Sequence, residues 1–146
     1  MLKKSILIVD DEEDIRDLLS YNLEKSGFNV DVASNGMECL SKIKSNKPDL
    51  ILLDVMMPEM DGLEVCEQIK SESTNADVLI CFLTARGEDY SQIAALESGG
   101  DDYVTKPFKP KDLLSRINAI LGRIEAKGSS QINGIQIDYE KYIVYK

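Results

Sequence analysis

Strand-like apolar runs alternate with helix-like stretches at intervals of roughly twenty residues along most of this chain. The strand-like runs are residues 5–9, 29–33, 50–53, 78–83 and 102–105. Between and after them, apolar residues recur at spacings of three and four, which is typical of one face of a helix. Five consecutive strand–helix units predict an α/β fold with a doubly wound, five-stranded parallel sheet and helices on both faces.

Polar residues stand where four of these runs end. Asp10 and Asp11 follow the first run, Asp54 the third, Thr84 the fourth and Lys106 the fifth. The carboxyl ends of parallel strands share one edge of a sheet, and ligands bind at that edge. We therefore expect three acids, a hydroxyl and a lysine to converge on one pocket that binds a divalent cation and a phosphoryl group.

Each of these signals alone has a purely structural explanation. Asp10 and Asp11 open an acidic run that could simply cap the next helix and favour its dipole. Asp54 could be a turn former, and the bond between Lys106 and Pro107 could be a cis peptide. Their joint occurrence at four strand ends, in order, favours the functional interpretation.

The chemistry of phosphoryl transfer accounts for these residue types. A carboxylate can act as a nucleophile toward phosphorus and form an aspartyl phosphate. Further carboxylates can hold Mg²⁺, which prefers oxygen ligands. A lysine and a hydroxyl can then hold the remaining phosphoryl oxygens.

Composition excludes several functions for these 146 residues. The net charge of −9 argues against nucleic-acid binding by phosphate neutralisation, and the lack of histidine excludes a histidine nucleophile or metal ligand. No apolar run approaches the ~20 residues of a membrane span, and the short N-terminal run does not resemble a signal peptide. Three cysteines without metal-site spacing predict reduced thiols in a cytoplasmic protein.

The composition changes after the fifth helix-like stretch. Residues 125–130 are polar and contain glycine, which predicts a linker. Residues 132–138 and 142–145 then predict two strands joined as a hairpin. Because a lone hairpin is marginally stable in water, either this hairpin packs on the preceding domain or the sequence is the front piece of a longer protein, and we favour the second interpretation.

Six short segments together resemble the receiver domain of two-component response regulators. They are Leu7-Ile-Val-Asp-Asp11, Asp49-Leu-Ile-Leu-Leu-Asp54, Met57-Pro58, Asp61-Gly62, Leu83-Thr-Ala85 and Lys106-Pro-Phe108. The resemblance covers residues 3 to about 124, and the stretch from Gly100 to Phe108 narrows it to the OmpR/PhoB-type subfamily.

This resemblance implies an architecture and a domain organisation. The sheet would have the flavodoxin-like strand order 2-1-3-4-5. Residues 1–124 would form the receiver (phosphoacceptor) domain, 125–130 a linker, and 131–146 the first strands of a winged-helix effector domain. The recognition helix of that effector domain would lie beyond Lys146.

The resemblance also assigns roles at the site. Asp54 would accept the phosphoryl group. Asp11, Asp54 and the backbone carbonyl of Met56 would ligate Mg²⁺, with Asp10 acting mainly through bound water.

The remaining site residues would respond to phosphorylation. Lys106 would pair with the phosphoryl oxygens, Thr84 would hydrogen-bond to them, and Tyr103 would turn inward. The expected dimer face consists of Ile93, Leu96, Asp101, Asp102, Asp112, Leu114 and Arg116. Gln92 departs from the family, which usually has a basic residue there, and this puts one intersubunit ion pair in doubt.

The resemblance therefore implies a phosphorylation-dependent regulator rather than an enzyme in its own right. It would take the phosphoryl group from the phosphohistidine of a sensor histidine kinase and promote its own phosphorylation and dephosphorylation. It would form a homodimer when phosphorylated, and it would reach DNA only through the effector domain, without a membrane partner.

Three other classes of protein share part of this sequence pattern. The main alternative is a stand-alone receiver that acts by protein–protein contacts only. A flavodoxin-like electron carrier would leave Asp54, Thr84 and Lys106 idle, and the sequence lacks a phosphate-cradling loop for it. A phosphatase with an aspartyl nucleophile would need an acid two residues after Asp54, where this chain has Met56.

Overall fold

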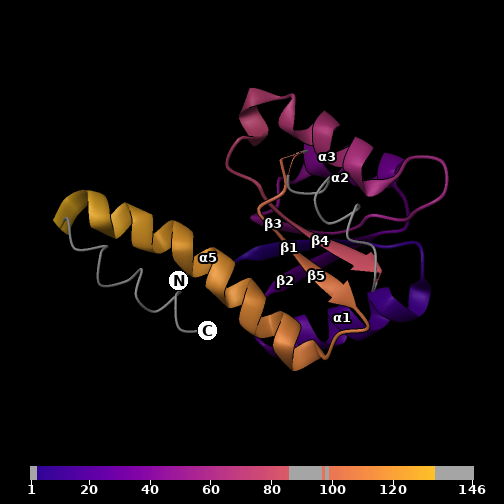
Figure 1. The fold of residues 1–146 in the computed structure, drawn as a ribbon, viewed down its shortest axis with the longest axis horizontal. Helices are drawn as coiled ribbons and strands as arrows, with labels where there is room; N and C mark the ends of the chain where they lie inside the picture. The colour runs from indigo at the N-terminus through magenta and orange to yellow at the C-terminus, as the bar shows by residue number, and fades with distance from the viewer. Residues whose placement is uncertain (1–2, 86–96, 98, 134–146) are drawn as a thin grey trace.

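The predicted parallel sheet forms, with the predicted strand order. The structure is a computed structural model that describes residues 3–85, 97 and 99–133. Its sheet contains β1 (Ser5–Val9), β2 (Asn29–Ala33), β3 (Leu50–Asp54), β4 (Leu79–Ala85) and β5 (Asp102–Lys106). All neighbouring strands are parallel, and their order is β2-β1-β3-β4-β5 (Figure 1).

Helices cover both faces of the sheet. The described helices are α1 (Glu13–Lys25), α2 (Gly36–Ser45), α3 (Gly62–Lys70) and α5 (Pro110–Asn133), with a short 3₁₀ turn at Ser73–Asn75. In Figure 1, α2 and α3 lie on one side of the strands, and α1 and α5 lie on the other. The helix predicted at residues 90–97 lies, except for Glu97, outside the described residues.

Two apolar clusters form the core, one on each face of the sheet. Along β1, Ile6 and Ile8 belong to the cluster with α1 and α5, whereas Leu7 and Val9 belong to the cluster with α2 and α3. Every residue of β3 is buried. A strand covered on both faces needs a continuous apolar run, which explains why Leu50-Ile-Leu-Leu53 shows no polar alternation.

Local signals fix where α2 and α3 begin. The side chain of Asn35 accepts a hydrogen bond from the Glu38 backbone N–H at 2.8 Å, and Asp61 forms a capping box with Glu64. A Cβ atom on Gly62 would lie 2.3 Å from the Asp54 carbonyl oxygen. Glycine at this position therefore lets the start of α3 approach the end of β3, where the acidic residue stands.

Helix α5 runs past residue 124, where the predicted receiver domain ends. Helix α5 continues through residues 125–130, the predicted linker, and ends at Asn133, so the first two residues of the predicted strand 132–138 are helical. Glu125, Ala126 and Lys127 are strong helix formers, and a single glycine costs only about 1 kcal/mol in a helix. The rest of the predicted hairpin, residues 134–146, lies outside the described residues.

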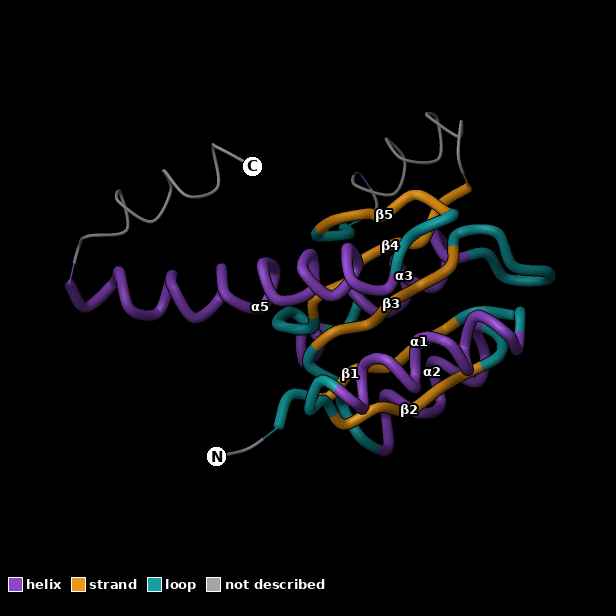
Figure 2. The backbone as a smooth tube through the Cα atoms, turned by 90° about the horizontal axis from the view of Figure 1, so that it is seen from below, coloured by secondary structure: helices purple, strands orange, loops and turns teal. Residues whose placement is uncertain are grey.

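Helix α5 consequently extends beyond the sheet. Figure 2 shows its C-terminal turns continuing past the strands. No helix in the described part of the chain is long and apolar enough to cross a membrane.

Candidate functional site

Three polar side chains are buried at the carboxyl ends of the central strands. Asp10 and Thr84 are fully buried, and Asp54 is 3% exposed. They are the only buried polar or charged residues within the part of the chain that the structure describes. Burial of polar groups costs free energy unless they are paired, so this concentration of them marks the candidate site.

Lys106, at the end of β5, joins the acids at this edge of the sheet. Its Nζ lies 3.1 Å from Oδ2 of Asp10, 3.5 Å from Oδ1 of Asp54 and 3.8 Å from Oε2 of Glu12. Burial lowers the pKa of Lys106, but Asp54 and Asp10 outweigh it, so the net pKa is raised and the lysine stays charged. The predicted convergence of Asp10, Asp54 and Lys106 is confirmed.

The negative charge of an ionised Asp54 is only partly offset by the groups around it. Burial is the main reason that its pKa rises to about 7, and the negative charge of Asp10 adds to that effect. Lys106 and a hydrogen bond from the Met56 backbone N–H, at 3.2 Å, oppose the rise. A further positive charge at the site would therefore favour the ionised, nucleophilic form of Asp54.

The turn after β1 supplies an oxygen-rich cluster. One carboxylate oxygen each from Asp10, Asp11 and Glu12 lies within 4.8 Å of the others. Oδ1 of Asp10 accepts from the Glu12 backbone N–H at 2.9 Å, and Oδ2 accepts from Lys106 at 3.1 Å. Because both Asp10 oxygens are engaged and Asp11 is exposed, this arrangement fits a direct role for Asp11 and an indirect one for Asp10.

The donor set fits Mg²⁺. Carboxylate and carbonyl oxygens are the ligands of hard cations, and Mg²⁺ is held by one or two carboxylates while keeping several waters. Asp54 lies outside the three-carboxylate cluster and is linked to it through Lys106. Glu12 is a member of the cluster that the sequence reasoning missed, although it lies in the acidic run that drew attention to Asp10 and Asp11.

Thr84 has an unusual environment. Its Oγ1 is buried and has no hydrogen-bond partner. Thr84 pairs in register with Thr105, next to Lys106, and the preceding Leu83 pairs with Asp54. A buried hydroxyl without a partner carries a desolvation cost, which a ligand oxygen at this edge could relieve.

The residues predicted for the switch and the dimer face are only partly described. Tyr103 is half-buried and packs against the cluster under α2 and α3. Ile93, Leu96 and Gln92 lie outside the described residues. Leu114 packs against the opposite cluster, and Asp112 is exposed.

Three of the four charged residues of the predicted dimer face, Asp101, Asp102 and Arg116, have partners within the chain. Oδ2 of Asp101 accepts from the Ile80 backbone N–H at 2.8 Å, so this side chain helps to hold β4. Nη1 of Arg116 lies 2.8 Å from Oδ1 of Asp102 and 3.3 Å from the Tyr103 carbonyl oxygen.

Comparison with known proteins adds independent information. The family model of the response regulator receiver domain matches residues 6–118. The chain belongs to this family. It is 47% identical over 138 residues to the alkaline phosphatase synthesis transcriptional regulatory protein PhoP of Bacillus subtilis, covering 94% of the chain and 57% of that protein.

A second relative belongs to the same subfamily of response regulators. The phosphate regulon transcriptional regulatory protein PhoB of Pseudomonas aeruginosa is 40% identical over 141 residues, covering 94% of the chain and 62% of that protein. The chain thus spans about three-fifths of the length of these curated relatives. They are OmpR/PhoB-type response regulators, so the predicted subfamily is confirmed.

Solved structures share the fold. A putative response regulator from Chloroflexus aurantiacus superposes with a TM-score of 0.80 at 35% identity, covering 83% of this chain and 99% of that one. A CheY-like receiver domain protein from Methanospirillum hungatei also gives 0.80, at 32% identity, with 86% and 99% covered.

Proposed function

We propose that this chain is the phosphoacceptor part of a transcriptional response regulator, and that Asp54 is the residue phosphorylated. The observation that carries the proposal is the environment of Asp54. It is a buried carboxylate with a raised pKa, and Lys106 lies 3.5 Å from its Oδ1. Such a buried carboxyl group is costly as a purely structural feature, whereas an aspartyl-phosphate site requires a carboxylate placed beside a cationic group.

The transfer is a displacement at phosphorus. A carboxylate oxygen of Asp54 forms the new P–O bond while the bond from phosphorus to the donor breaks, and the donor leaves with its electron pair. This chain contains no histidine, so the phosphohistidine is supplied by a sensor histidine kinase. Small phosphodonors such as acetyl phosphate offer the same chemistry.

The site residues orient and stabilise the phosphoryl group. Lys106 is held between Asp10 and Asp54 and can pair with a phosphoryl oxygen, and the Thr84 hydroxyl gains the partner that it lacks. Asp11, Asp54 and the Met56 carbonyl would hold Mg²⁺, with Asp10 acting through water. Mg²⁺ would supply positive charge that reduces repulsion between the carboxylate and the phosphoryl group.

Intact-mass spectrometry after incubation with acetyl phosphate and Mg²⁺ tests this assignment. The parent protein should gain one phosphoryl group, and Asp54→Asn should gain none. Asp17→Asn removes an exposed carboxylate from α1 and is the matched control, which should be phosphorylated like the parent. A phosphoryl adduct that persists in Asp54→Asn would move the site to another residue.

Phosphorylation would then promote a homodimer. The switch would begin with Thr84 and Lys106, draw Tyr103 inward, and favour association through the face that carries Leu96, Leu114 and Arg116. This is a shift between pre-existing states rather than a new fold.

Sedimentation velocity of phosphorylated variants tests the dimer. Leu96→Asp should stay monomeric, because it places a charge within an apolar interface. Met37→Asp changes a residue that is 64% exposed on α2, outside the proposed dimer face, and should dimerise like the parent. Dimerisation of Leu96→Asp equal to that of the parent would place the interface elsewhere.

The output would be control of transcription through a DNA-binding effector domain. The relatives are transcriptional regulators, and this chain spans about three-fifths of their length. With a net charge of −9, the 146 residues themselves should not retard DNA in a gel-shift assay, whereas a longer protein with the effector domain should. Absence of DNA binding by the longer protein would favour a receiver that acts through protein contacts.

A further inference from the structure

The turn between β1 and α1 carries the three-carboxylate cluster of Asp10, Asp11 and Glu12, and four hydrogen bonds hold its backbone. The Asp10 N–H donates to the Ala33 carbonyl at 3.2 Å, and the Glu12 N–H donates to Oδ1 of Asp10 at 2.9 Å. The Arg16 N–H donates to the Glu12 carbonyl at 3.1 Å. The fourth bond comes from the Arg16 side chain, whose Nη1 donates to the Asp10 carbonyl at 2.8 Å.

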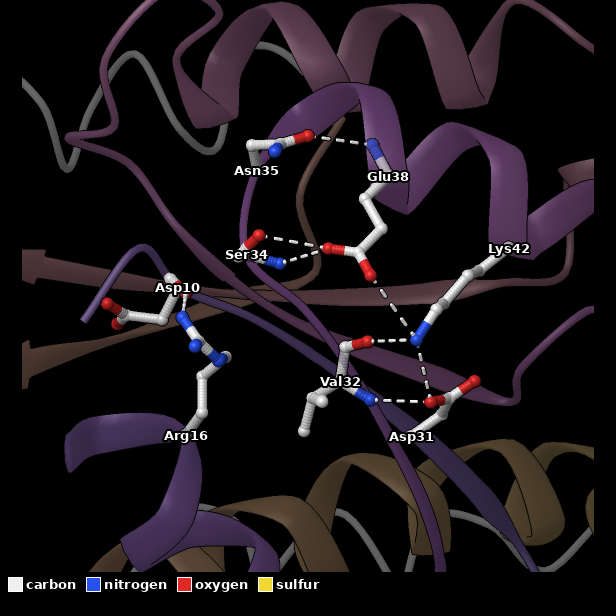
Figure 3. A network of polar contacts seen from close by, with 8 residues as sticks. All are labelled: Asp10, Arg16, Asp31, Val32, Ser34, Asn35, Glu38 and Lys42. Carbon is white, nitrogen blue, oxygen red and sulfur yellow. Dashed lines mark hydrogen bonds and ion pairs between the residues drawn. The ribbon is translucent and has the colours of Figure 1, made fainter. Parts of the chain in front are cut away.

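The Arg16 contact differs from the other three. It is a charged donor from the fourth residue of α1 that reaches back to the residue after β1, as Figure 3 shows. Lys106 is the shared cation of Asp10, Glu12 and Asp54, whereas Arg16 binds a main-chain carbonyl. Hydrogen bonds from charged donors are stronger than neutral ones, so this contact restrains the turn more than an ordinary backbone bond does.

Asp11 is the residue that depends most on this restraint. It lies between Asp10 and Glu12, and its side chain is exposed. Its position is therefore set by the backbone of its two neighbours. Mg²⁺ demands near-ideal octahedral geometry, so a loose turn would bind it less well.

We propose that Arg16 is a positioning residue that preorganises the β1–α1 turn for Mg²⁺ binding. The proposal rests on the proposed function, because it deepens the account of the same site. The proposed effect of Arg16 on Mg²⁺ affinity is opposite in sign to the effect of its charge. A guanidinium beside an acidic cluster repels a divalent cation, so if charge alone mattered, removing Arg16 would tighten Mg²⁺ binding. If positioning matters more, removing Arg16 weakens it.

Calorimetric titration of Mg²⁺ into the 146-residue protein separates these two effects by sign. We expect Arg16→Ala to raise the Mg²⁺ dissociation constant about tenfold, the typical cost of removing a residue that orients a metal ligand. Arg16→Lys retains the charge and one donor and should recover most of the affinity. Lys25→Ala removes the same charge from the last turn of α1 and should bind Mg²⁺ like the parent.

Two further measurements exclude a merely structural role. Amide hydrogen exchange in metal-free buffer should accelerate at Asp11 and Glu12 in Arg16→Ala, while the thermal midpoint stays within a few degrees of the parent. The rate of phosphorylation by acetyl phosphate should return to the parent value at saturating Mg²⁺, because only occupancy of the site is impaired.

The outcomes distinguish this inference from the proposed function. If the parent binds Mg²⁺ and Arg16→Ala binds it equally well or more tightly, the positioning role is overturned and the phosphoacceptor proposal stands. If the parent binds no Mg²⁺, both are overturned. A weaker Arg16→Ala with recovery in Arg16→Lys supports the positioning role.

Discussion

At the scale of single residues, Asp54 is a carboxyl group that the fold makes hard to ionise. Its pKa is raised to about 7, first by burial and then by the charge of Asp10. The ordinary value is 3.8, so in metal-free buffer the folded state holds a proton on Asp54 through a range in which the unfolded state has lost it. Below pH 4 this carboxyl group is protonated in both states and does not destabilise the folded protein. Above about pH 7 it is ionised in both states, and the full cost of the buried charge lowers the stability of the folded protein.

Asp54→Asn should therefore stabilise the metal-free protein by an amount that grows with pH. We expect the difference in unfolding free energy from the parent to be small at pH 4 and to reach about 1–3 kcal/mol at pH 8. Urea denaturation of both proteins with a chelator present, at several pH values, measures it. A difference independent of pH would mean that Asp54 titrates normally in the folded protein.

The unpartnered hydroxyl of Thr84 leads to a second prediction. Valine has nearly the same shape and lacks the hydroxyl, so Thr84→Val should stabilise the unphosphorylated protein by about 1 kcal/mol. Thermal denaturation is the measurement. The aspartyl phosphate of the variant should in turn form more slowly, since one donor to the phosphoryl group is lost. A destabilised Thr84→Val would show that the hydroxyl is already satisfied.

At the scale of elements, α2 is tied to the edge strand β2 by a polar network around Lys42. Its Nζ donates to Oδ1 of Asp31 at 3.0 Å and to the Val32 carbonyl, and it lies 3.6 Å from Oε2 of Glu38 (Figure 3). The Val32 N–H donates to the same Asp31 oxygen at 2.8 Å. Both backbone groups of Val32 are thus satisfied by side chains, which protects an otherwise open sheet edge.

Lys42→Ala should destabilise the protein by about 0.5–1 kcal/mol, because the ion pairs are half-exposed and worth little but the Val32 carbonyl loses its donor. Urea denaturation measures the loss. Lys44→Ala removes an exposed lysine from the same helix and is the matched control, expected to be neutral. Equal stability of the two variants would show that the network adds nothing to the packing of α2.

At the scale of the whole molecule, the three cysteines report on global unfolding. All three cysteines are buried, and none forms a disulfide. Cys39 and Cys66 belong to the apolar cluster under α2 and α3, and Cys81 belongs to the cluster under α1 and α5. Burial raises the pKa of the Cys39 thiol to about 12, so its reactive thiolate is scarce. Access to these thiols requires opening of both sides of the sheet.

The cysteines should therefore react with a thiol reagent roughly a thousandfold more slowly in the native protein than in urea, in proportion to the unfolded fraction. Ellman's reagent follows the reaction. Ile8→Ala, which leaves a cavity in the core and costs about 2–5 kcal/mol, should accelerate it in step with the lost stability. Rapid modification of one thiol in the parent would reveal local opening instead.

The sequence by itself determined the order of the elements and the edge at which the site lies. Apolar periodicity separates strands from helices, and parallel strands bring Asp10, Asp54, Thr84 and Lys106 to one edge, because their carboxyl ends point the same way. The short motifs around these residues were enough to identify the family, because they contain the residues of the site and not only residues that pack in the core.

Only the tertiary structure decided how these groups interact. Lys106 meets Asp10 across 96 positions of sequence, and the raised pKa of Asp54 depends on burial by neighbours from several strands. The roles of Glu12 and Arg16 depend on the path of one turn, which periodicity does not encode. The helical conformation of residues 125–130 was not predicted for a related reason, because one glycine in this segment is a weak stop signal whose effect depends on its surroundings.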